Sequence, residues 1–255
     1  MPETLADESA RCAQHLLVDQ VEAGYGGPPV IAELCASVGL GEVVCVAGPN
    51  GAGKSTLVKA IIGEIAVSAG TVSLGSEEIT NLATDKLAHR GVGYVPQHED
   101  VFDTLTVVEN LELGGYLLSR RQAKEKISEI LEVFPALKAM RSRSVGRLSG
   151  GERKMVAVGR VLMLGPSVLI LDEPTAGLSV PLTRALLQDH VRRLADTGTG
   201  VLLIEQKATE ALQVADWGYI LVSGTVKVSA SASELLARPD IGEIFLGGST
   251  SVRAG

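Results

Sequence analysis

The sequence is poor in aromatic residues and in cysteine. Phe, Trp and Tyr together make up 3% of the 255 residues, so we expect a core built from Val, Leu, Ile and Ala. The three cysteines, Cys12, Cys35 and Cys45, show no C-x-x-C spacing. An odd number without such spacing argues against a disulfide framework and against a zinc site. A reducing compartment is therefore expected.

Long apolar segments and a positive charge balance are also missing. A membrane helix needs roughly 18–20 apolar residues, and the longest candidate run, residues 161–171, is interrupted by Gly165 and Pro166. The first eight residues are acidic, whereas a secretory signal is basic and then apolar. A formal charge of −7 argues against general nucleic-acid binding. We expect a cytoplasmic protein that reaches a membrane only through a partner.

A glycine-rich loop is the strongest local signal. Residues 48–55 read G-P-N-G-A-G-K-S and fit the pattern G-x-x-x-x-G-K-[ST]. An apolar run, residues 43–47, precedes the loop and a helical pattern follows over 56–62, which is the context in which this pattern binds phosphate. Backbone N–H groups then surround the phosphates, Lys54 adds a positive charge, and the Ser55 hydroxyl is placed to ligate Mg²⁺. The sequence therefore predicts binding of a nucleoside triphosphate.

Two further motifs follow in a fixed order. Residues 148–152 read L-S-G-G-E and lie ahead of a stretch with helical apolar spacing. A buried-strand pattern at residues 168–172 ends in the carboxylates of Asp172 and Glu173. The phosphate-binding loop, L-S-G-G-E and an apolar strand ending in Asp-Glu, in this order, resemble the ATP-binding cassette (ABC) ATPases. The resemblance runs from about residue 17 to residue 248.

The resemblance implies an α/β fold, an ABC-type P-loop NTPase cassette with an inserted helical subdomain and an N-terminal antiparallel β region. Residues 1–14 are interpreted as a flexible leader and residues 15–255 as a single ABC ATPase domain. The helical subdomain is expected over about residues 100–165, where Thr106 and Glu109 have the spacing of a capping box. Alternating strands and helices elsewhere indicate a largely parallel sheet covered on both faces. No internal repeat is visible, so one cassette is expected.

Local patterns place the individual elements. Strands are expected at 16–21, 72–74, 92–95 and 200–204, a hairpin at 217–228 with its turn at Ser223-Gly224, and helices at 124–134 and 181–194. Pro135 stands where the first of these helices should stop.

The resemblance also implies roles for single residues. Asp172 would hold Mg²⁺, and Glu173 would orient or deprotonate the attacking water. Gln97 lies where the family's Q-loop glutamine reaches Mg²⁺ or this water. Tyr25 matches the aromatic residue that stacks on adenine. The predicted nucleotide-binding residues are Tyr25, Gly48, Pro49, Asn50, Gly51, Ala52, Gly53, Lys54, Ser55, Thr56, Ser149, Gly150 and Gly151; the metal ligands are Ser55, Gln97 and Asp172; and the catalytic residues are Glu173, Gln97 and Gln206.

Ser149, Gly150 and Gly151 open a predicted helix, whose free N–H groups and positive dipole end suit an anion. In the ABC family this element reaches the γ-phosphate of the nucleotide that the opposite subunit binds. The resemblance therefore implies that ATP lies between two cassettes and that hydrolysis requires a dimer.

Two positions depart from the commonest family pattern. Ser179 stands where many members have Asp, which puts the usual contact across the dimer in doubt. Gln206 stands where most members have the switch histidine, and a glutamine amide donates a hydrogen bond but carries no positive charge. With the segments 109–115 and 245–248, the Ile-Glu-Gln at 204–206 looks like one ATPase subunit of the branched-chain amino acid importers.

That resemblance implies a second ABC ATPase subunit, homologous or identical, two transmembrane permease subunits and an external solute-binding protein. The chain would then lie on the inner face of the cell membrane, held there by the permeases. Importers of urea and short amides share much of this pattern, and Gln97 lies where some branched-chain members have Glu. Exporters of lipid or polysaccharide also use free-standing ATPases, so they stay open as an alternative.

Two other classes fit the sequence less well, and no nucleic-acid partner is expected. ABC ATPases that act on DNA insert a long coiled coil between the P-loop and L-S-G-G-E, whereas residues 55–148 leave room only for a small helical subdomain. Translation-associated and regulatory ABC proteins usually carry two cassettes in one chain.

A basic segment lies inside the predicted helical subdomain. Residues 120–147 contain eight Lys or Arg and three Glu, a net charge of +5 in an otherwise acidic chain. This segment is either a solvated helical face or a contact surface for a membrane subunit or anionic lipid. The residues do not decide between the two.

Overall fold

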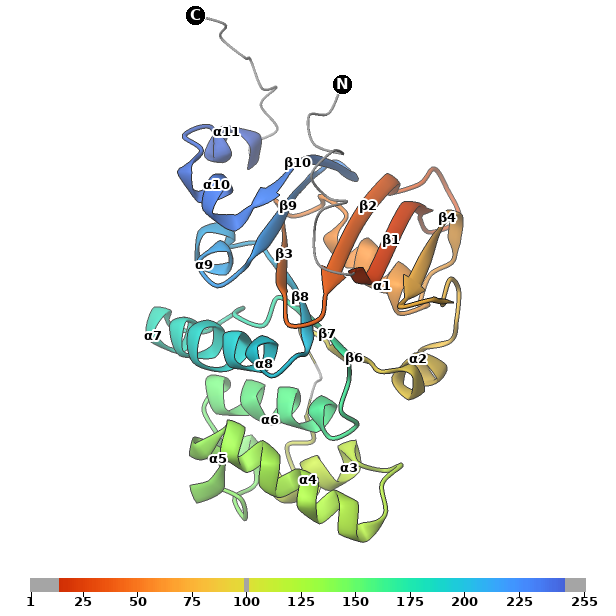
Figure 1. The fold of residues 1–255 in the computed structure, drawn as a ribbon. Coiled ribbons are helices and arrows are strands. Elements are labelled where there is room, and N and C mark those ends of the chain that lie inside the picture. Colours follow the sequence, from red (N-terminus) through yellow and green to blue (C-terminus); the bar gives the residue numbers. More distant parts are fainter. Residues whose placement is uncertain (1–13, 99–100, 246–255) are drawn as a thin grey trace, which may run out of the picture.

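The computed structural model describes residues 14–98 and 101–245. In this part of the chain, a four-stranded antiparallel sheet has the order β2-β1-β4-β5, and a six-stranded sheet has the order β10-β9-β3-β8-β7-β6 (Figure 1). The strands are β1 Gln14–Ala23, β2 Ile31–Gly39, β3 Val43–Ala47, β4 Val67–Leu74, β5 Glu77–Glu78, β6 Val92–Val95, β7 Val168–Asp172, β8 Gly200–Glu205, β9 Trp217–Val222 and β10 Thr225–Ser231. Within the second sheet only β10 is antiparallel to its neighbour.

Helices surround the six-stranded sheet and form a separate group at the bottom of Figure 1. They are α1 Lys54–Ile61, α2 Thr84–Arg90, α3 Val107–Gly114, α4 Arg120–Val133, α5 Pro135–Ala139, η2 Val145–Arg147, α6 Gly150–Leu162, α7 Val180–Arg184, η3 Ala185–Val191, α8 Arg192–Asp196, α9 Ala208–Leu212, α10 Ala232–Ala237 and α11 Ile241–Phe245. The group of α3 to α6 is inserted in the chain between β6 and β7. None of the helices in the described part of the chain has the length and apolar character that crossing a bilayer requires.

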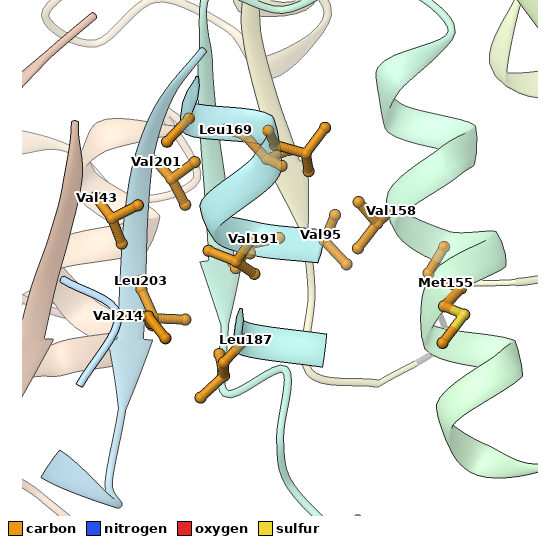
Figure 2. Close-up of a cluster of buried hydrophobic side chains, with 14 of the residues drawn as sticks. Val43, Val95, Met155, Val158, Leu169, Leu187, Val191, Val201, Leu203 and Val214 are labelled. Atoms are coloured by element: carbon orange, nitrogen blue, oxygen red, sulfur yellow. The ribbon is translucent and has the colours of Figure 1, made fainter. Parts of the chain in front are cut away.

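Alternation along the parallel strands produces two cores, one on each face of the sheet. Val43 and Cys45 face the cluster that includes α6, η3 and α9, while Val44 and Val46 face the cluster shared with α1 and the antiparallel sheet. Figure 2 shows part of the first cluster, with strand residues such as Leu203 on one side, Leu187 and Val191 of η3 in the middle, and Met155 and Val158 of α6 on the other side. Because both faces are covered, the parallel strands are largely apolar up to their carboxyl ends, as in other parallel sheets.

The expected fold class is confirmed, and several boundaries shift. The strand expected at 72–74 begins at Val67, and Gln14, assigned to the leader, begins β1. Pro135 does follow the end of α4, but it opens α5 as its first residue, where a missing N–H costs nothing. The helix expected at 181–194 spans α7, η3 and α8, with π-type hydrogen bonds in its middle section.

Two local predictions hold in detail. At α3, the Thr106 hydroxyl accepts from the Glu109 N–H and the Glu109 carboxylate accepts from the Thr106 N–H, a complete capping box. In the β9–β10 hairpin, Ser223 and Gly224 have φ angles of 47° and 79°, and positive values at both positions are what a two-residue hairpin turn requires. Residues 1–13 of the expected leader lie outside the described residues, so the proposed domain division stays a prediction.

Candidate nucleotide site

Three neighbouring parallel strands end at one edge of the six-stranded sheet. β8 lies between β3 and β7, and the last residues of β3 and β8, Ala47 and Glu205, are paired. The glycine-rich loop leaves β3, Glu173 follows β7, and Gln206 follows β8. Ligands of open parallel sheets bind outside the carboxyl ends of the strands. This carboxyl edge is therefore the candidate site.

The glycine-rich loop, residues 48–53, has the geometry of an anion cradle. Gly51 and Gly53 have φ angles of 79° and 103°, in the left-handed region that favours glycine. A Cβ atom at Gly48 would lie 2.2 Å from the carbonyl oxygen of Leu221, so only glycine fits against β9 there. α1 begins with no side-chain cap and no acidic residue in its first turn. Its first N–H groups lack intrahelical acceptors, so they fit a phosphate group.

Lys54 begins α1 and points back into this loop. Its side chain is 5% exposed. The Nζ atom donates to the carbonyl oxygens of Gly48 at 2.8 Å and Pro49 at 3.2 Å, and lies 3.7 Å from Oε1 of Glu173. The ammonium group is thus held by the loop itself and by one carboxylate. A phosphate in the loop would meet this charge directly.

Glu173 is held from two sides. Its backbone N–H donates to the carbonyl oxygen of Ile204 at 2.9 Å, which extends the pairing of β7 and β8 by one residue. Its φ of 43° is unusual for a non-glycine residue and turns the chain away from the sheet. Nε2 of Gln97, 76 residues earlier in the chain, donates to its Oε2 at 3.0 Å. Gln97 and Lys54 therefore fix the carboxylate between them.

Asp172 lies beside Glu173 and is partly buried. Burial, followed by the neighbouring Glu173 carboxylate, raises its pKa, while Lys54 and the Tyr94 hydroxyl act in the opposite direction. Burial and then the Asp172 charge raise the pKa of Tyr94 to about 12. The phenol therefore stays protonated and hydrogen-bonds to Asp172. Two adjacent carboxylates in this setting favour a bound cation.

The donor set fits magnesium. Asp172 supplies a carboxylate, Ser55 an exposed hydroxyl and Gln97 an amide oxygen, which are the hard oxygen ligands that Mg²⁺ takes. Mg²⁺ usually keeps several positions for water and phosphate oxygens and needs few protein ligands. The residues present therefore fit a Mg-nucleotide complex.

The L-S-G-G-E segment begins α6 with Ser149 as the N-cap. The Ser149 hydroxyl accepts from the Glu152 N–H at 3.4 Å, and Oε2 of Glu152 accepts from the Ser149 N–H at 2.7 Å. This capping box leaves the N–H groups of Gly150 and Gly151 without intrahelical acceptors. Cβ atoms built at these glycines would lie 3.4 and 3.3 Å from the side chains of Leu178 and Leu182. Their proposed contact with a second subunit's nucleotide stays a prediction.

Tyr25 and Ser179 are exposed. The Tyr25 side chain is 59% exposed, and Nζ of Lys59, on α1, lies 5.7 Å from the centroid of its ring. The ring therefore lies beside α1, the helix that follows the phosphate loop. Its stacking on adenine stays a prediction. Ser179 occupies the N-cap position of α7, after the turn that follows Glu173, and its side chain makes no capping hydrogen bond.

The sequence interpretation missed three residues of this edge. Tyr94 contacts Asp172, and Lys154 on α6 donates to the carbonyl oxygens of Pro96 at 3.3 Å and Gln97 at 3.4 Å. Glu205, at the end of β8, is 3% exposed. Lys154 and Glu205 could have been found from the sequence, because each is a charged residue at a position where the local apolar pattern predicts burial.

Residues 32–176 match the ABC transporter family. The chain belongs to this family, and its fold and carboxyl-edge site define it as an ABC ATPase subunit, a class that binds ATP. The matched residues contain the glycine-rich loop (the P-loop), L-S-G-G-E and Asp172-Glu173, and the ABC class expected from these motifs is confirmed.

Several known proteins are similar over nearly their whole length. A probable branched-chain amino acid transport ATP-binding protein, LivF, from Archaeoglobus fulgidus is 38% identical over 229 residues, covering 89% of this chain and 97% of LivF. The high-affinity branched-chain amino acid transport ATP-binding protein BraG from Pseudomonas aeruginosa is 35% identical, covering 91% and 100%. The lipopolysaccharide export system ATP-binding protein LptB from Escherichia coli is 31% identical, covering 91% and 97%.

Solved structures agree with this assignment. An ATP-binding cassette of an ABC transporter in its ADP conformation superposes with a TM-score of 0.84 at 29% identity, covering 92% of this chain and 100% of that one. A nucleotide-free cassette gives 0.82 at 28% identity, covering 91% and 98%.

Proposed function

We propose that this chain hydrolyses ATP to drive import of branched-chain or related amino acids through a membrane transporter. The observation that carries the ATPase part is Glu173, held between Gln97 and Lys54 beside a phosphate cradle. The similarity to LivF and BraG, whose names state branched-chain amino acid transport, supports the solute. The Ile-Glu-Gln at residues 204–206, with Gln206 where most ABC members have a switch histidine, points in the same direction.

Each residue has a separate part in the proposed reaction. Lys54 exchanges its carbonyl and carboxylate contacts for the β- and γ-phosphates, which frees Glu173 to orient water in line with the γ-phosphate. Gln97, through its hydrogen bond to Glu173, holds the carboxylate in position beside this water. Gln206 donates a hydrogen bond to the γ-phosphate. Mg²⁺, held by Ser55, Asp172 and Gln97, would neutralise charge on the phosphate oxygens.

A groove beside α3 supports a permease contact. Its volume is about 250 Å³, and it is lined mainly by apolar groups from α2, β6, α3 and α6. Tyr116, 64% exposed, and Leu113, 46% exposed, lie on its rim. Tyr94 lines the groove and also hydrogen-bonds to Asp172. We propose that a cytoplasmic segment of a permease docks here and is sensed at the metal site through Tyr94.

The test is ATP hydrolysis by the chain assembled with its permeases and solute-binding protein in vesicles. We expect Mg-dependent turnover that EDTA abolishes and that the binding protein loaded with leucine, isoleucine or valine stimulates. Stimulation by urea or acetamide in place of amino acids would reassign the solute. The absence of any ATP turnover in the assembled complex would refute the function.

Export is the second candidate, favoured by the 31% identity to LptB over 91% of this chain. In that case turnover in the assembled complex would respond to a lipopolysaccharide or lipid substrate and would be indifferent to amino acids and to a solute-binding protein.

A further inference from the structure

A buried carboxylate links the two loops that carry Glu173 and Gln206. Glu205 is the last residue of β8, after a run of buried apolar residues, and is 3% exposed. Burying a carboxylate is costly unless hydrogen bonds satisfy it. Its Oε1 accepts from the Thr175 N–H at 3.1 Å and from the Thr175 hydroxyl at 2.7 Å. The backbone N–H of Gln206 also donates to this carboxylate.

The contact lies where the regular pairing of β7 and β8 has ended. At the end of this pairing, the backbone N–H of Glu173 donates to the carbonyl oxygen of Ile204. Beyond it the chain after β7 turns away, with Ala176 N–H donating to Glu173 and Leu178 N–H donating to Thr175. The Glu205 side chain then replaces the strand pairing as the connection between the two loops.

Thr175 is well placed to transmit this connection. It is 1% exposed, two residues after Glu173 and four before Ser179. Its N–H is buried, and the Glu205 carboxylate is its hydrogen-bond acceptor. A displacement of Glu205 and of the neighbouring Gln206 backbone is therefore passed to the turn after Glu173 through the two hydrogen bonds between Thr175 and Glu205.

We infer that Glu205 is a positioning residue, which through Thr175 sets the turn carrying Glu173 and Ser179 relative to Gln206. This inference rests on the proposed function. Within residues 14–98 and 101–245, the Glu205 and Thr175 side chains hydrogen-bond to each other and not to the phosphate loop. Their contact should therefore act on the chemical step and leave nucleotide affinity unaltered.

Variants of Thr175 test the contact while the buried Glu205 carboxylate keeps the backbone N–H of residue 175 as a hydrogen-bond donor. Thr175→Val keeps size and backbone but removes the hydroxyl, whereas Thr175→Ser keeps the hydroxyl. In the assembled transporter we expect Thr175→Val to lower the kcat of ATP hydrolysis about tenfold, the scale of one lost hydrogen bond to a charged group. The KM for ATP should stay within about twofold of wild type, and Thr175→Ser should restore kcat to within about twofold.

Thr183 supplies the matched control. It is a buried threonine, 3% exposed, on α7 after the same turn, and among the described residues its hydroxyl has no hydrogen-bond partner. Thr183→Val should therefore leave kcat unaltered. Glu205→Gln, which keeps one acceptor oxygen, should fall between wild type and Thr175→Val, and thermal melts accompany every variant.

The possible outcomes distinguish a failure of the positioning role of Glu205 from a failure of the proposed ATPase function. A Thr175→Val variant with wild-type kcat overturns the inference, as does a variant that loses ATP affinity and kcat in parallel, because either makes the contact merely structural. A wild-type complex without ATP turnover instead refutes the proposed function itself.

Discussion

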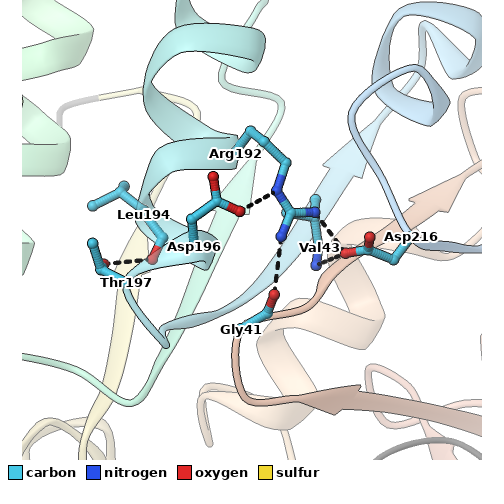
Figure 3. Close-up of polar contacts among 7 residues, drawn as sticks. All are labelled: Gly41, Val43, Arg192, Leu194, Asp196, Thr197 and Asp216. Carbon is cyan, nitrogen blue, oxygen red and sulfur yellow. Dashed lines mark hydrogen bonds and ion pairs between the residues drawn. The ribbon is translucent and has the colours of Figure 1, made fainter.

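Two basic side chains, Arg192 at the amino ends of the parallel strands and Lys54 at their carboxyl ends, are held in different ways. We call these two ends of the sheet the amino edge and the carboxyl edge. At the amino edge, Arg192 on α8 donates to the Gly41 carbonyl oxygen at 3.0 Å and pairs with Asp196 at 3.0 Å and Asp216 at 2.7 Å (Figure 3). Asp216 also accepts from the Val43 N–H at 2.8 Å, so the guanidinium connects a helix to the starts of two strands. The contacts with Gly41 and Asp216 join α8 to the segments that precede β3 and β9, whereas the contact with Asp196 lies within α8.

At the carboxyl edge, the contacts of the basic side chain are ones that a bound phosphate could replace. Lys54 rests on two carbonyl oxygens of a glycine loop and lies 3.7 Å from Glu173, and a phosphate would replace these contacts. Asp172 and Glu173 are like charges side by side, which destabilises the ligand-free site and favours a cation. The difference indicates that an arginine paired with two carboxylates and a carbonyl oxygen stabilises the fold, whereas a lysine in a glycine-rich loop beside paired carboxylates indicates a ligand site.

The sharpest way to break the carboxyl edge is Lys54→Ala. Removing the ammonium from the glycine-rich loop should abolish both measurable ATP binding and ATP turnover, because we propose that this charge meets the β- and γ-phosphates. Titration with a fluorescent ATP analogue measures the affinity. Lys86→Ala, an exposed lysine on α2, is the control and should bind like wild type. Unaltered affinity in the Lys54 variant would contradict the assignment of the loop.

Glu173→Gln should separate binding from chemistry at the same edge. The amide keeps the shape and the neighbours of the carboxylate but cannot accept the proton of water, so turnover should fall by about two orders of magnitude or more. ATP should still bind and should hold the chain with a second cassette, which size-exclusion runs with and without Mg-ATP would show. The exposed Glu78→Gln serves as control. Wild-type turnover would remove Glu173 from its role.

Gln206 should give a smaller effect. Glutamine supplies one neutral hydrogen bond where histidine supplies a charge-assisted one, a difference of about 1 kcal/mol, or up to about tenfold in rate. Gln206→His should leave turnover equal or modestly higher, and Gln206→Ala should lower it clearly. Steady-state ATPase assays of the assembled complex, with the sister site disabled, decide this, with Gln213→Ala as control. An alanine variant as fast as wild type would make Gln206 a bystander.

The amino edge should respond in stability and hardly in activity. Arg192→Ala removes three polar contacts of a side chain that is 30% exposed, which should cost about 1–2 kcal/mol of unfolding free energy and lower the Tm by roughly 2–6 °C. ATP turnover should stay within about twofold. Arg193→Ala, at the exposed neighbouring position, should hardly change the Tm. A large loss of turnover in a folded Arg192 variant would end the distinction between the two edges.

Local sequence patterns predicted the parts whose structure depends on near neighbours. The Thr106–Glu109 capping box, the Ser223-Gly224 turn and the glycine loop all follow from side chains or φ preferences within a few residues. The strand order could not be read in the same way, because β3 pairs with β8 and β9, more than 150 residues away. Packing of both sheet faces against helices selects that order.

The sequence by itself determined the class of the protein. The spacing of the residues in G-x-x-x-x-G-K-S, L-S-G-G-E and Asp172-Glu173 is a property of the chain, and phosphate binding needs that spacing. Only the tertiary structure decided which side chains meet there, since the contacts of Gln97 with Glu173 and of Glu205 with Thr175 span 76 and 30 residues. Such contacts form because burying the apolar strands fixes the backbone, and polar groups left at the strand ends must then find partners at that edge.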